Sequence, residues 1–190
     1  FSSTQPVCGN AGILITFTSF NPINLSYTLD YSVNGVAQST VTVTSLPYTL
    51  PTPVAGTYIL TGFKYNNGLI TGVVDPTALI VYANPIVSNA GPDQSLCGVS
   101  GTVLAGNNPA PNSGLWTIIS GAGGTLINSS NYATPFTGVP GETYILRWTI
   151  SNFTCTSFDE VIISFPVVAA RPSAFVTAPN PVCQGSGGYI

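Results

Sequence analysis

Short runs in which apolar and polar residues alternate, bounded by turn residues, constrain this chain more than any other feature. They occur over residues 13–17, 25–33 and 144–150. Alternation with a period of two places one face of a strand in a core and the other in solvent. No run shows the 3.6-residue period of a helix, and 20 Gly and 16 Pro interrupt the chain throughout. The pattern predicts an all-β protein built from antiparallel sheets.

Two Asn-Gly pairs mark the sharpest turns, Asn34-Gly35 and Asn67-Gly68. A two-residue type I′ turn needs positive φ at both positions, which Asn and Gly tolerate. The first turn would pair Val33 with Val36 and would then turn the apolar residues at 41 and 43 to the wrong face. Because a one-residue slip flips every side chain, we expect a bulge or a longer loop between Val36 and residue 41.

The balance of charged residues excludes several classes of partner. Lys and Arg number 3 against 6 Asp and Glu, and charged residues make up 5% of the chain. Nucleic acids and anionic membranes both need basic residues, so neither is an expected partner. Apolar runs are too short for a membrane-spanning helix. His is absent, which removes the commonest general base and metal ligand. We therefore expect no enzyme activity, and no catalytic, cofactor-binding or metal site.

The few acidic residues give no sign of a site. Only Asp159 and Glu160 are adjacent, and neighbouring residues of a strand point to opposite faces. Asp93 follows a Gly-Pro pair and is typical of a turn. Arg147 alternates with core positions and is expected to face solvent.

Turn-rich segments divide the chain into two blocks of similar length, 1–84 and 85–168, followed by residues 169–190. Each block has the size of an immunoglobulin-like sandwich. The tail contains Pro181-Val182-Cys183, which repeats Pro6-Val7-Cys8 at an offset of 175 residues. A self-match at a fixed offset is typical of repeat arrays. We expect the tail to hold a linker and the first strand of a following repeat.

The four cysteines have no Cys-x-x-Cys spacing that would suggest a metal or redox motif. Cys97 and Cys155 lie in one block, so the expected disulfide joins them. Trp116 falls between them, as in the Cys-Trp-Cys core of immunoglobulin domains. Cys8 and Cys183 have no partner within their own segments. They are expected to be buried free thiols, with bonds to neighbouring chains or domains as the alternative.

The alternating runs also indicate which large side chains form the core. Five tyrosines offer a sugar-stacking face as an alternative, although their alternation with polar residues favours the core: Tyr27, Tyr31, Tyr48, Tyr58 and Tyr82. The expected core residues are Trp116, Trp148, Tyr27, Leu29, Tyr58, Leu60, Tyr144 and Leu146.

Several separated motifs occur in order in the second block: Asn89-Ala90-Gly91-Pro92-Asp93, Gly114-Leu115-Trp116-Thr117 and Gly141-Glu142-Thr143-Tyr144. With them, residues 85–168 resemble the PKD-like and Ig-like repeats of giant Bacteroidetes surface proteins, including gliding-motility adhesins. The first block resembles a companion domain of those proteins through Pro6-Val7-Cys8 and Gly56-Thr57-Tyr58. Such domains often carry a second cysteine near Asn67, which this chain lacks. The resemblance implies tandem Ig-like and PKD-like β-sandwiches in an elongated array, type IX secretion and a cell-surface location.

Three functions fit these observations. The first is a repeat in the shaft of a large extracellular adhesin or filament, linked to surface attachment or gliding motility, with neighbouring repeats as its partners. The second is a self-assembling filament subunit in which residues 175–190 complete the sheet of another copy. The third is a carbohydrate-binding module of a secreted protein, with surface polysaccharide as its partner.

Overall fold

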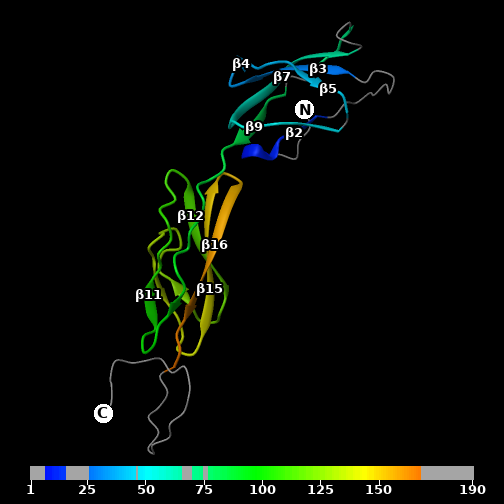
Figure 1. Ribbon diagram of the computed structural model, residues 1–190. Helices are drawn as coiled ribbons and strands as arrows, with labels where there is room; N and C mark the ends of the chain where they lie inside the picture. Colours follow the sequence, from blue (N-terminus) through cyan, green and yellow to red (C-terminus); the bar gives the residue numbers. More distant parts are fainter. Residues whose placement is uncertain (1–6, 16–25, 46, 66–69, 75–76, 168–190) are drawn as a thin grey trace, which may run out of the picture. The chain divides into compact units, whose positions relative to one another are not determined.

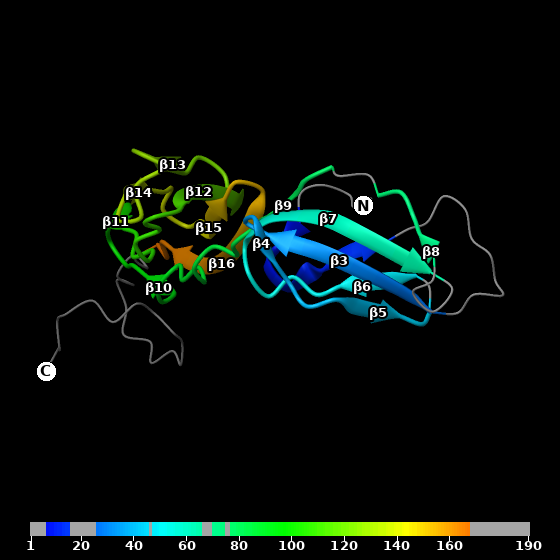
Figure 2. The ribbon, with the colours of Figure 1, turned by 90° about the horizontal axis from the view of Figure 1, so that it is seen from above.

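The computed structural model describes residues 7–15, 26–45, 47–65, 70–74 and 77–167 (Figure 1). Two compact units divide the chain. The first comprises Phe1–Asn84 together with Asn152–Cys155, and the second comprises Pro85–Ser151 and Thr156–Ile190. The described residues hold one short 3₁₀ turn, Gly9–Ala11, and no α-helix. Strands of both units are drawn in Figures 1 and 2.

In the first unit, the described residues form a seven-stranded sheet and a two-stranded sheet. The large sheet has the order β1-β9-β7-β3-β4, with β5 on β3 and β8 on β7, and the small sheet pairs β2 with β6. The strands are β1 Val7–Cys8, β2 Ile13–Ile15, β3 Tyr27–Val33, β4 Val36–Ala37, β5 Val41–Val43, β6 Tyr48–Leu50, β7 Gly56–Tyr65, β8 Ile70–Thr71 and β9 Leu79–Tyr82.

The Asn34-Gly35 turn has the predicted geometry. Asn34 has φ 52° and Gly35 has φ 80°, which are the positive values of a type I′ turn. Val33 pairs with Val36 across it. The Asn34 side-chain oxygen also accepts a hydrogen bond from the Thr57 amide at 2.9 Å. The second Asn-Gly pair, at 67–68, lies outside the described residues.

The bulge predicted after this turn is confirmed. Near the turn, Ser32 pairs with Ala37. Further along, Leu29 pairs with Val41 and Tyr27 with Val43, so the partner strand has gained one residue. The shift returns the apolar side chain of Val43 to the buried face, where it is 1% exposed. Burial of apolar area on one face thus decides the register.

Both sheets of the first unit contribute to a single core. Its buried residues are Val7, Ile13, Ile15, Tyr27, Leu29, Val43, Leu50, Tyr58, Leu60, Leu79 and Val81. Tyr58 lies near the start of β7, and its buried hydroxyl donates a hydrogen bond to the Val54 carbonyl at 2.8 Å. Desolvation by burial raises the pKa of this phenol, the Val54 hydrogen bond lowers it and Tyr31 raises it, with a net rise.

In the second unit, the described strands form a four-stranded sheet of order β10-β16-β15-β12 and a three-stranded sheet of order β11-β14-β13. This is the division of an immunoglobulin-like sandwich, with C, F and G strands in one sheet and B, E and D strands in the other. The strands are β10 Gln94–Ser95, β11 Gly101–Val103, β12 Ser113–Ser120, β13 Thr125–Leu126, β14 Pro135–Thr137, β15 Thr143–Asn152 and β16 Cys155–Ser164.

Two tryptophans fill the centre of the second core. Trp116 on β12 pairs with Trp148 on β15, and their rings lie 5.1 Å apart. Each indole N–H is satisfied by a backbone carbonyl at 3.2 Å, that of Tyr132 for Trp116 and that of Asn107 for Trp148. A Cβ at Gly114 would come 2.3 Å from the Trp148 ring, so the indole packs directly on the backbone there.

The two units repeat one corner motif. Tyr144 near the start of β15 donates a hydrogen bond to the Ala122 carbonyl at 2.7 Å and accepts one from the Val139 amide at 2.8 Å. Tyr58 holds the equivalent place in β7. A tyrosine at this corner, bonded to backbone a few residues upstream, is typical of immunoglobulin-like sandwiches. Both units are therefore all-β Ig-like or PKD-like sandwiches. The eight side chains expected in the core are all buried.

Candidate functional site

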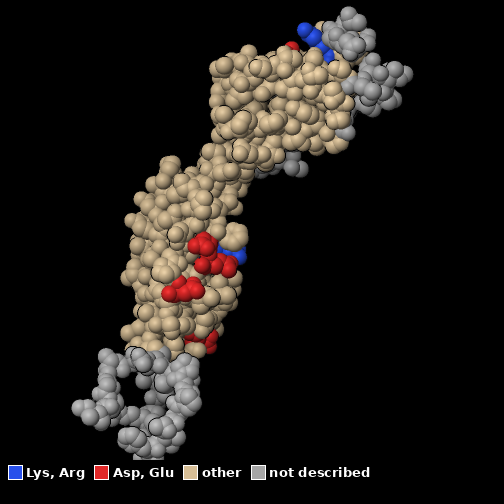
Figure 3. Space-filling view, viewed as in Figure 1, with Lys and Arg blue, Asp and Glu red and all other residues tan. Residues whose placement is uncertain are grey.

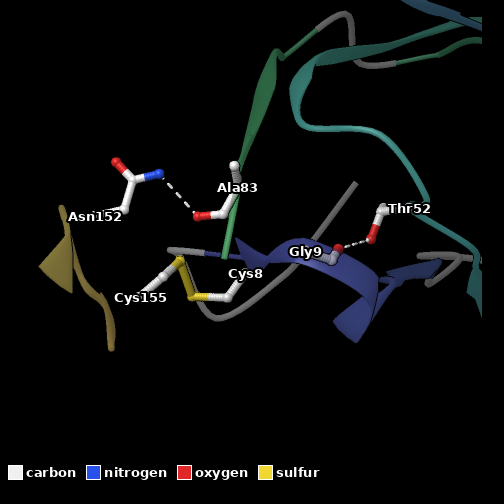
Figure 4. Close-up of a disulfide and its surroundings, with 6 residues drawn as sticks. All are labelled: Cys8, Gly9, Thr52, Ala83, Asn152 and Cys155. Carbon is white, nitrogen blue, oxygen red and sulfur yellow. Dashed lines mark hydrogen bonds between the residues drawn. A yellow bond between two sulfur atoms is a disulfide. The ribbon is translucent and has the colours of Figure 1, made fainter. Parts of the chain in front are cut away.

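A disulfide in the first unit holds the turn that joins β15 to β16. Cys8 is bonded to Cys155 with 5.6 Å between their Cα atoms, and the two residues are 147 positions apart in sequence (Figure 4). The turn, Asn152–Cys155, belongs to the first unit. The strands that continue from its two ends belong to the second. The bond therefore lies within the first unit, where it joins the first strand to a turn that is encoded far downstream in the sequence.

Cys8 is positioned by the first strand of the unit. β1 runs parallel to β9, where Val7 pairs with Val81 and Cys8 with Tyr82. Val7 is 4% exposed and belongs to the core. Because side chains alternate along a strand, the buried Val7 directs Cys8 away from the core and toward the incoming turn.

Hydrogen bonds immobilise the backbone just after Cys8. The buried Thr52 hydroxyl donates to the Gly9 carbonyl at 2.5 Å (Figure 4). It also accepts a hydrogen bond from the Gly12 amide at 3.1 Å. Gly9 itself has φ 44°. A Cβ at this position would also overlap the Asn84 side chain. The Gly9 carbonyl and the Gly12 amide, both bonded to Thr52, thus fix the backbone that follows Cys8.

The turn makes its own noncovalent contacts beside the disulfide. The Asn152 side-chain amide donates to the Ala83 carbonyl at 2.8 Å (Figure 4). The ring of Phe153 lies 4.6 Å from that of Tyr82. Phe153 has φ 55°, a conformation that L-residues other than Asn, Asp and Gly seldom adopt. The ring contact and the amide hydrogen bond accompany this strained conformation.

Burial of the bond favours a structural role over a redox one. Cys155 is 2% exposed and Cys8 is half-buried. Thiol–disulfide exchange requires a thiolate to reach a sulfur atom, so burial slows reduction. Such bonds persist in oxidising compartments outside the cytoplasm.

The predicted disulfide between Cys97 and Cys155 is wrong, because the two residues lie at opposite ends of β16. Cys155 is the first residue of that ten-residue strand. Cys97 follows β10, whose Ser95 pairs with Ser164 at the far end. At about 3.3 Å per residue, the strand separates these ends by about 30 Å. A disulfide needs Cα atoms within about 7 Å.

The expectation that Cys8 is a free thiol is also wrong, since its partner comes from outside its own block. Cys97 is disulfide-bonded as well, and Cys183 lies outside the described residues. One signal in the sequence could have indicated the pairing. Cys155 follows a long alternating strand and Asn152, which places it at a hairpin turn rather than within a core.

The adjacent acidic residues Asp159 and Glu160 make a hydrogen bond with the backbone and an ion pair, respectively. Asp159 accepts a hydrogen bond from the Ala90 amide at 2.8 Å, while its neighbour Glu160 accepts two from Arg147 at 2.6 and 2.9 Å. The Arg147 guanidinium also lies 4.3 Å from the centre of the Phe158 ring. About a third of each side chain of the ion pair is exposed, so it contributes about 0–1 kcal/mol.

Asp93 does more than shape a turn. Its carboxylate accepts a hydrogen bond from the Ile162 amide at 2.8 Å and so fastens the segment before β10 to β16. Among the described residues, no three His, Cys, Asp or Glu side chains gather as a metal site would require. Charged side chains are sparse on the face in Figure 3.

The tyrosines considered for sugar stacking are largely committed to packing. Tyr27 and Tyr58 are buried. Tyr31, Tyr48 and Tyr82 are half-buried. Tyr31 stacks on Tyr58 with ring centroids 6.2 Å apart, and Tyr82 contacts the turn. Over the part of the chain that the structure describes, no helix is long and apolar enough to span a membrane.

Comparisons with known proteins find similar chains among solved structures. No protein-family model matches the chain, and no curated protein does. Among solved structures, the PKD domain from the KIAA 1837 protein is 23% identical with a TM-score of 0.40, over 54% of this chain and 100% of that one. The fibronectin(III)-like modules of Clostridium thermocellum CbhA are 15% identical with a TM-score of 0.37, over 90% and 98%.

Extracellular domains 3–5 of Drosophila OTK are 12% identical with a TM-score of 0.34, over 85% of this chain and 61% of that one. Likeness at this level assigns the chain to no family and says nothing of activity or partners.

Proposed function

We propose that this chain is a structural repeat in the shaft of an extracellular bacterial surface adhesin or filament, and that it bears tension rather than carrying out chemistry. The observation that carries the proposal is the Cys8–Cys155 disulfide, which bridges 147 positions of sequence. The partners of this repeat are the neighbouring repeats of the same chain.

The covalent path explains why this bond suits a shaft. Tension applied at the two ends of the chain enters through residues 1–8, crosses the disulfide and leaves through residues 155–190. Residues 9–154, which include most of both sandwiches, lie off that path. They are spared extension as long as the disulfide is intact. Without the disulfide, the applied tension would act on every residue between the two ends of the chain.

Composition supports an extracellular setting. A buried disulfide is stable where thiols are oxidised. The 3 Lys and Arg residues leave few sites for trypsin-like proteases. The narrower assignment, to gliding-type adhesins of Bacteroidetes exported by the type IX route, rests on the motifs of residues 85–168.

Single-molecule stretching tests the proposal. The chain is held by handles at its two ends, in a Cys97→Ser/Cys183→Ser background so that only Cys8–Cys155 can form. Breaking the bond with a reductant should add 147 residues of contour, which is about 500 Å at 3.3–3.6 Å per residue. The wild-type chain serves as the reference.

Equal lengthening of the oxidised and reduced chains would refute a tension-bearing bond.

Native material on a reducing denaturing gel separates the shaft from the subunit hypothesis. A band of far higher mass than 19.6 kDa supports covalently linked repeats. A band at that mass supports a subunit that exchanges strands through residues 175–190.

A further inference from the structure

The Asn34-Gly35 turn joins two residues that can react with each other. The Gly35 amide nitrogen can attack Cγ of Asn34, since glycine has no side chain to hinder the approach. The new N–Cγ bond closes a cyclic imide, the Cγ–Nδ2 bond breaks and ammonia leaves with the amide proton. Water then adds to either imide carbonyl and opens the ring to aspartate or isoaspartate.

Solvent reaches both residues. Asn34 and Gly35 are exposed, and a Cβ built on Gly35 would meet no atom within 4 Å. The water and hydroxide that the reaction needs are therefore at hand. Whether Asn34 reacts is decided by the conformation of the turn.

The folded turn keeps the reacting atoms apart. Asn34 has φ 52° and Gly35 has φ 80°, as in a type I′ turn. In such a turn ψ of the first residue is about 30°, which places the Gly35 nitrogen nearly opposite Cβ of Asn34 about the Cα–C bond. Ring closure requires the nitrogen on the same side as Cβ. The imide can therefore form only after ψ of Asn34 has rotated through well over a right angle.

Contacts with β7 and β4 oppose that rotation. The Asn34 amide donates to the Thr57 carbonyl at 2.9 Å, and the Thr57 amide donates to Oδ1 of Asn34 at 2.9 Å. A Cβ at Gly56 would come 2.5 Å from the same Oδ1, so the carboxamide packs directly on the backbone of Gly56. On the other side, Val33 pairs with Val36. Both the backbone and the side chain of Asn34 are thus held in the unreactive arrangement.

We infer that Asn34 is a modification site that the closed hairpin protects, and that it is converted to aspartate or isoaspartate when the turn opens. Local opening of a hairpin costs less free energy than unfolding of the whole unit, so the site responds to small openings as well as to complete unfolding. This inference goes beyond the proposed function and does not depend on it.

The two products leave the turn in different states. Aspartate keeps an oxygen in the place of Oδ1, so the Thr57 amide can still donate to it and the turn can close again. Isoaspartate carries the main chain through Cβ and Cγ of residue 34, which lengthens the connection between Val33 and Val36. The two-residue turn that pairs these valines cannot form again with that connection. Isoaspartate therefore marks permanently a hairpin that has opened.

Mass spectrometry of aged protein tests the inference. The full chain is kept in mildly alkaline buffer, one sample native and one in urea above its last unfolding transition, and is then reduced and cut after Lys64 at mildly acidic pH. Asn34-Gly35 is the only Asn-Gly pair in peptide 1–64, so fragmentation assigns the conversion to Asn34. Conversion should be at least about ten times faster in urea, because only the opened fraction of the native chain reacts.

Equal rates in the two samples would overturn the protection, and no conversion in urea would overturn the site itself. This comparison uses the wild-type chain, so it does not depend on whether any variant folds.

Gly56→Ala tests the contact that holds the carboxamide. Its Cβ would displace the Asn34 side chain from Thr57, so the native variant should convert several times faster than native wild type, with equal rates in urea. Gly62→Ala is the matched control on β7. Its Cβ would lie 2.8 Å from the Asp30 carboxylate, away from the turn, and its native rate should equal that of wild type. If Gly56→Ala reacts no faster than Gly62→Ala, the hydrogen bond from Thr57 does not protect Asn34.

Discussion

The Tyr144 hydroxyl makes two hydrogen bonds to the backbone in the second core. It donates to Ala122 and accepts from Val139, and the residue is fully buried. Tyr144→Phe removes both hydrogen bonds at once, and a hydrogen bond of this kind typically contributes about 0.5–1.5 kcal/mol. We expect the free energy of unfolding to fall by about 1–3 kcal/mol, measured by urea denaturation with tryptophan fluorescence.

The matched control is Tyr132→Phe in the same unit. Tyr132 is 40% exposed, and its hydroxyl makes no hydrogen bond within the described residues. This variant should change the free energy of unfolding by less than about 0.5 kcal/mol. Equal losses for the two variants would mean that the corner hydrogen bonds contribute nothing specific.

Tyr58 gives a prediction about alkaline pH. Its folded pKa is raised above the ordinary value of 10.0, chiefly by desolvation, so the folded state favours the protonated phenol. Its contribution is complete below pH 10 and declines as pH rises through 10 toward the folded pKa, because the unfolded chain loses the proton first. The free energy of unfolding should therefore fall more steeply above pH 10 than in Tyr58→Phe. Parallel curves for the two proteins would contradict the shift.

Residue patterns predicted the core but not the disulfides. Alternation reports which face of a strand is buried, and for Tyr27, Leu29, Tyr144 and Leu146 that face is the core. Cysteine spacing carries no such information, because four cysteines allow three connectivities. The choice depends on which strand ends meet, and this is set by tertiary structure.

At the scale of elements, the Asn34-Gly35 hairpin offers a clean test of backbone conformation. Gly35 has φ 80°, and a Cβ there would meet nothing within 4 Å. Gly35→Ala therefore introduces left-handed backbone strain without a clash. We expect a loss of about 1–2 kcal/mol in the free energy of unfolding of the first unit, measured by urea denaturation with near-ultraviolet circular dichroism of tyrosine.

Gly35→Asn is the control for that substitution, since Asn tolerates the left-handed region better than Ala. It should cost clearly less than Gly35→Ala. If the two variants lose the same stability, the side chain rather than the backbone angle is responsible.

The same hairpin shows why some elements could be predicted from sequence in detail. A two-residue turn and an apolar face together leave one consistent register, and Val43 is buried only if the strand gains a residue. The bulge between Asp30 and Tyr31, where β3 pairs with β7, had no comparable signal. Both strands there have mixed polarity, and only the neighbouring pairing decides the register.

For the whole molecule, the turn Asn152–Cys155 is counted with the first unit, although it is encoded within the second block. Block boundaries predicted from turn-rich segments follow the order of the peptide chain, so they cannot reveal that a turn encoded in one block belongs to the other unit. That assignment requires Cys8 and Cys155 to meet, which depends on contacts between residues far apart in sequence.

The stability of both units consequently depends on the loop that the Cys8–Cys155 disulfide closes. In the chain-entropy description, closing a loop of 147 positions raises the free energy of unfolding by about 5 kcal/mol. The constraint acts most strongly on the state in which both sandwiches are unfolded, because the loop includes most of both. We expect Cys8→Ala/Cys155→Ala to lower the final urea transition by this amount, followed by tryptophan fluorescence and tyrosine circular dichroism together.

The reduced protein provides the control, because every disulfide is already open there. In reductant, the same double substitution should change the free energy of unfolding by less than about 1 kcal/mol. A large loss in both conditions would show that the cysteine side chains stabilise by packing. A negligible loss in both would show that the bond does not restrict the unfolded chain, and a shaft would then gain protection from tension without any gain in equilibrium stability.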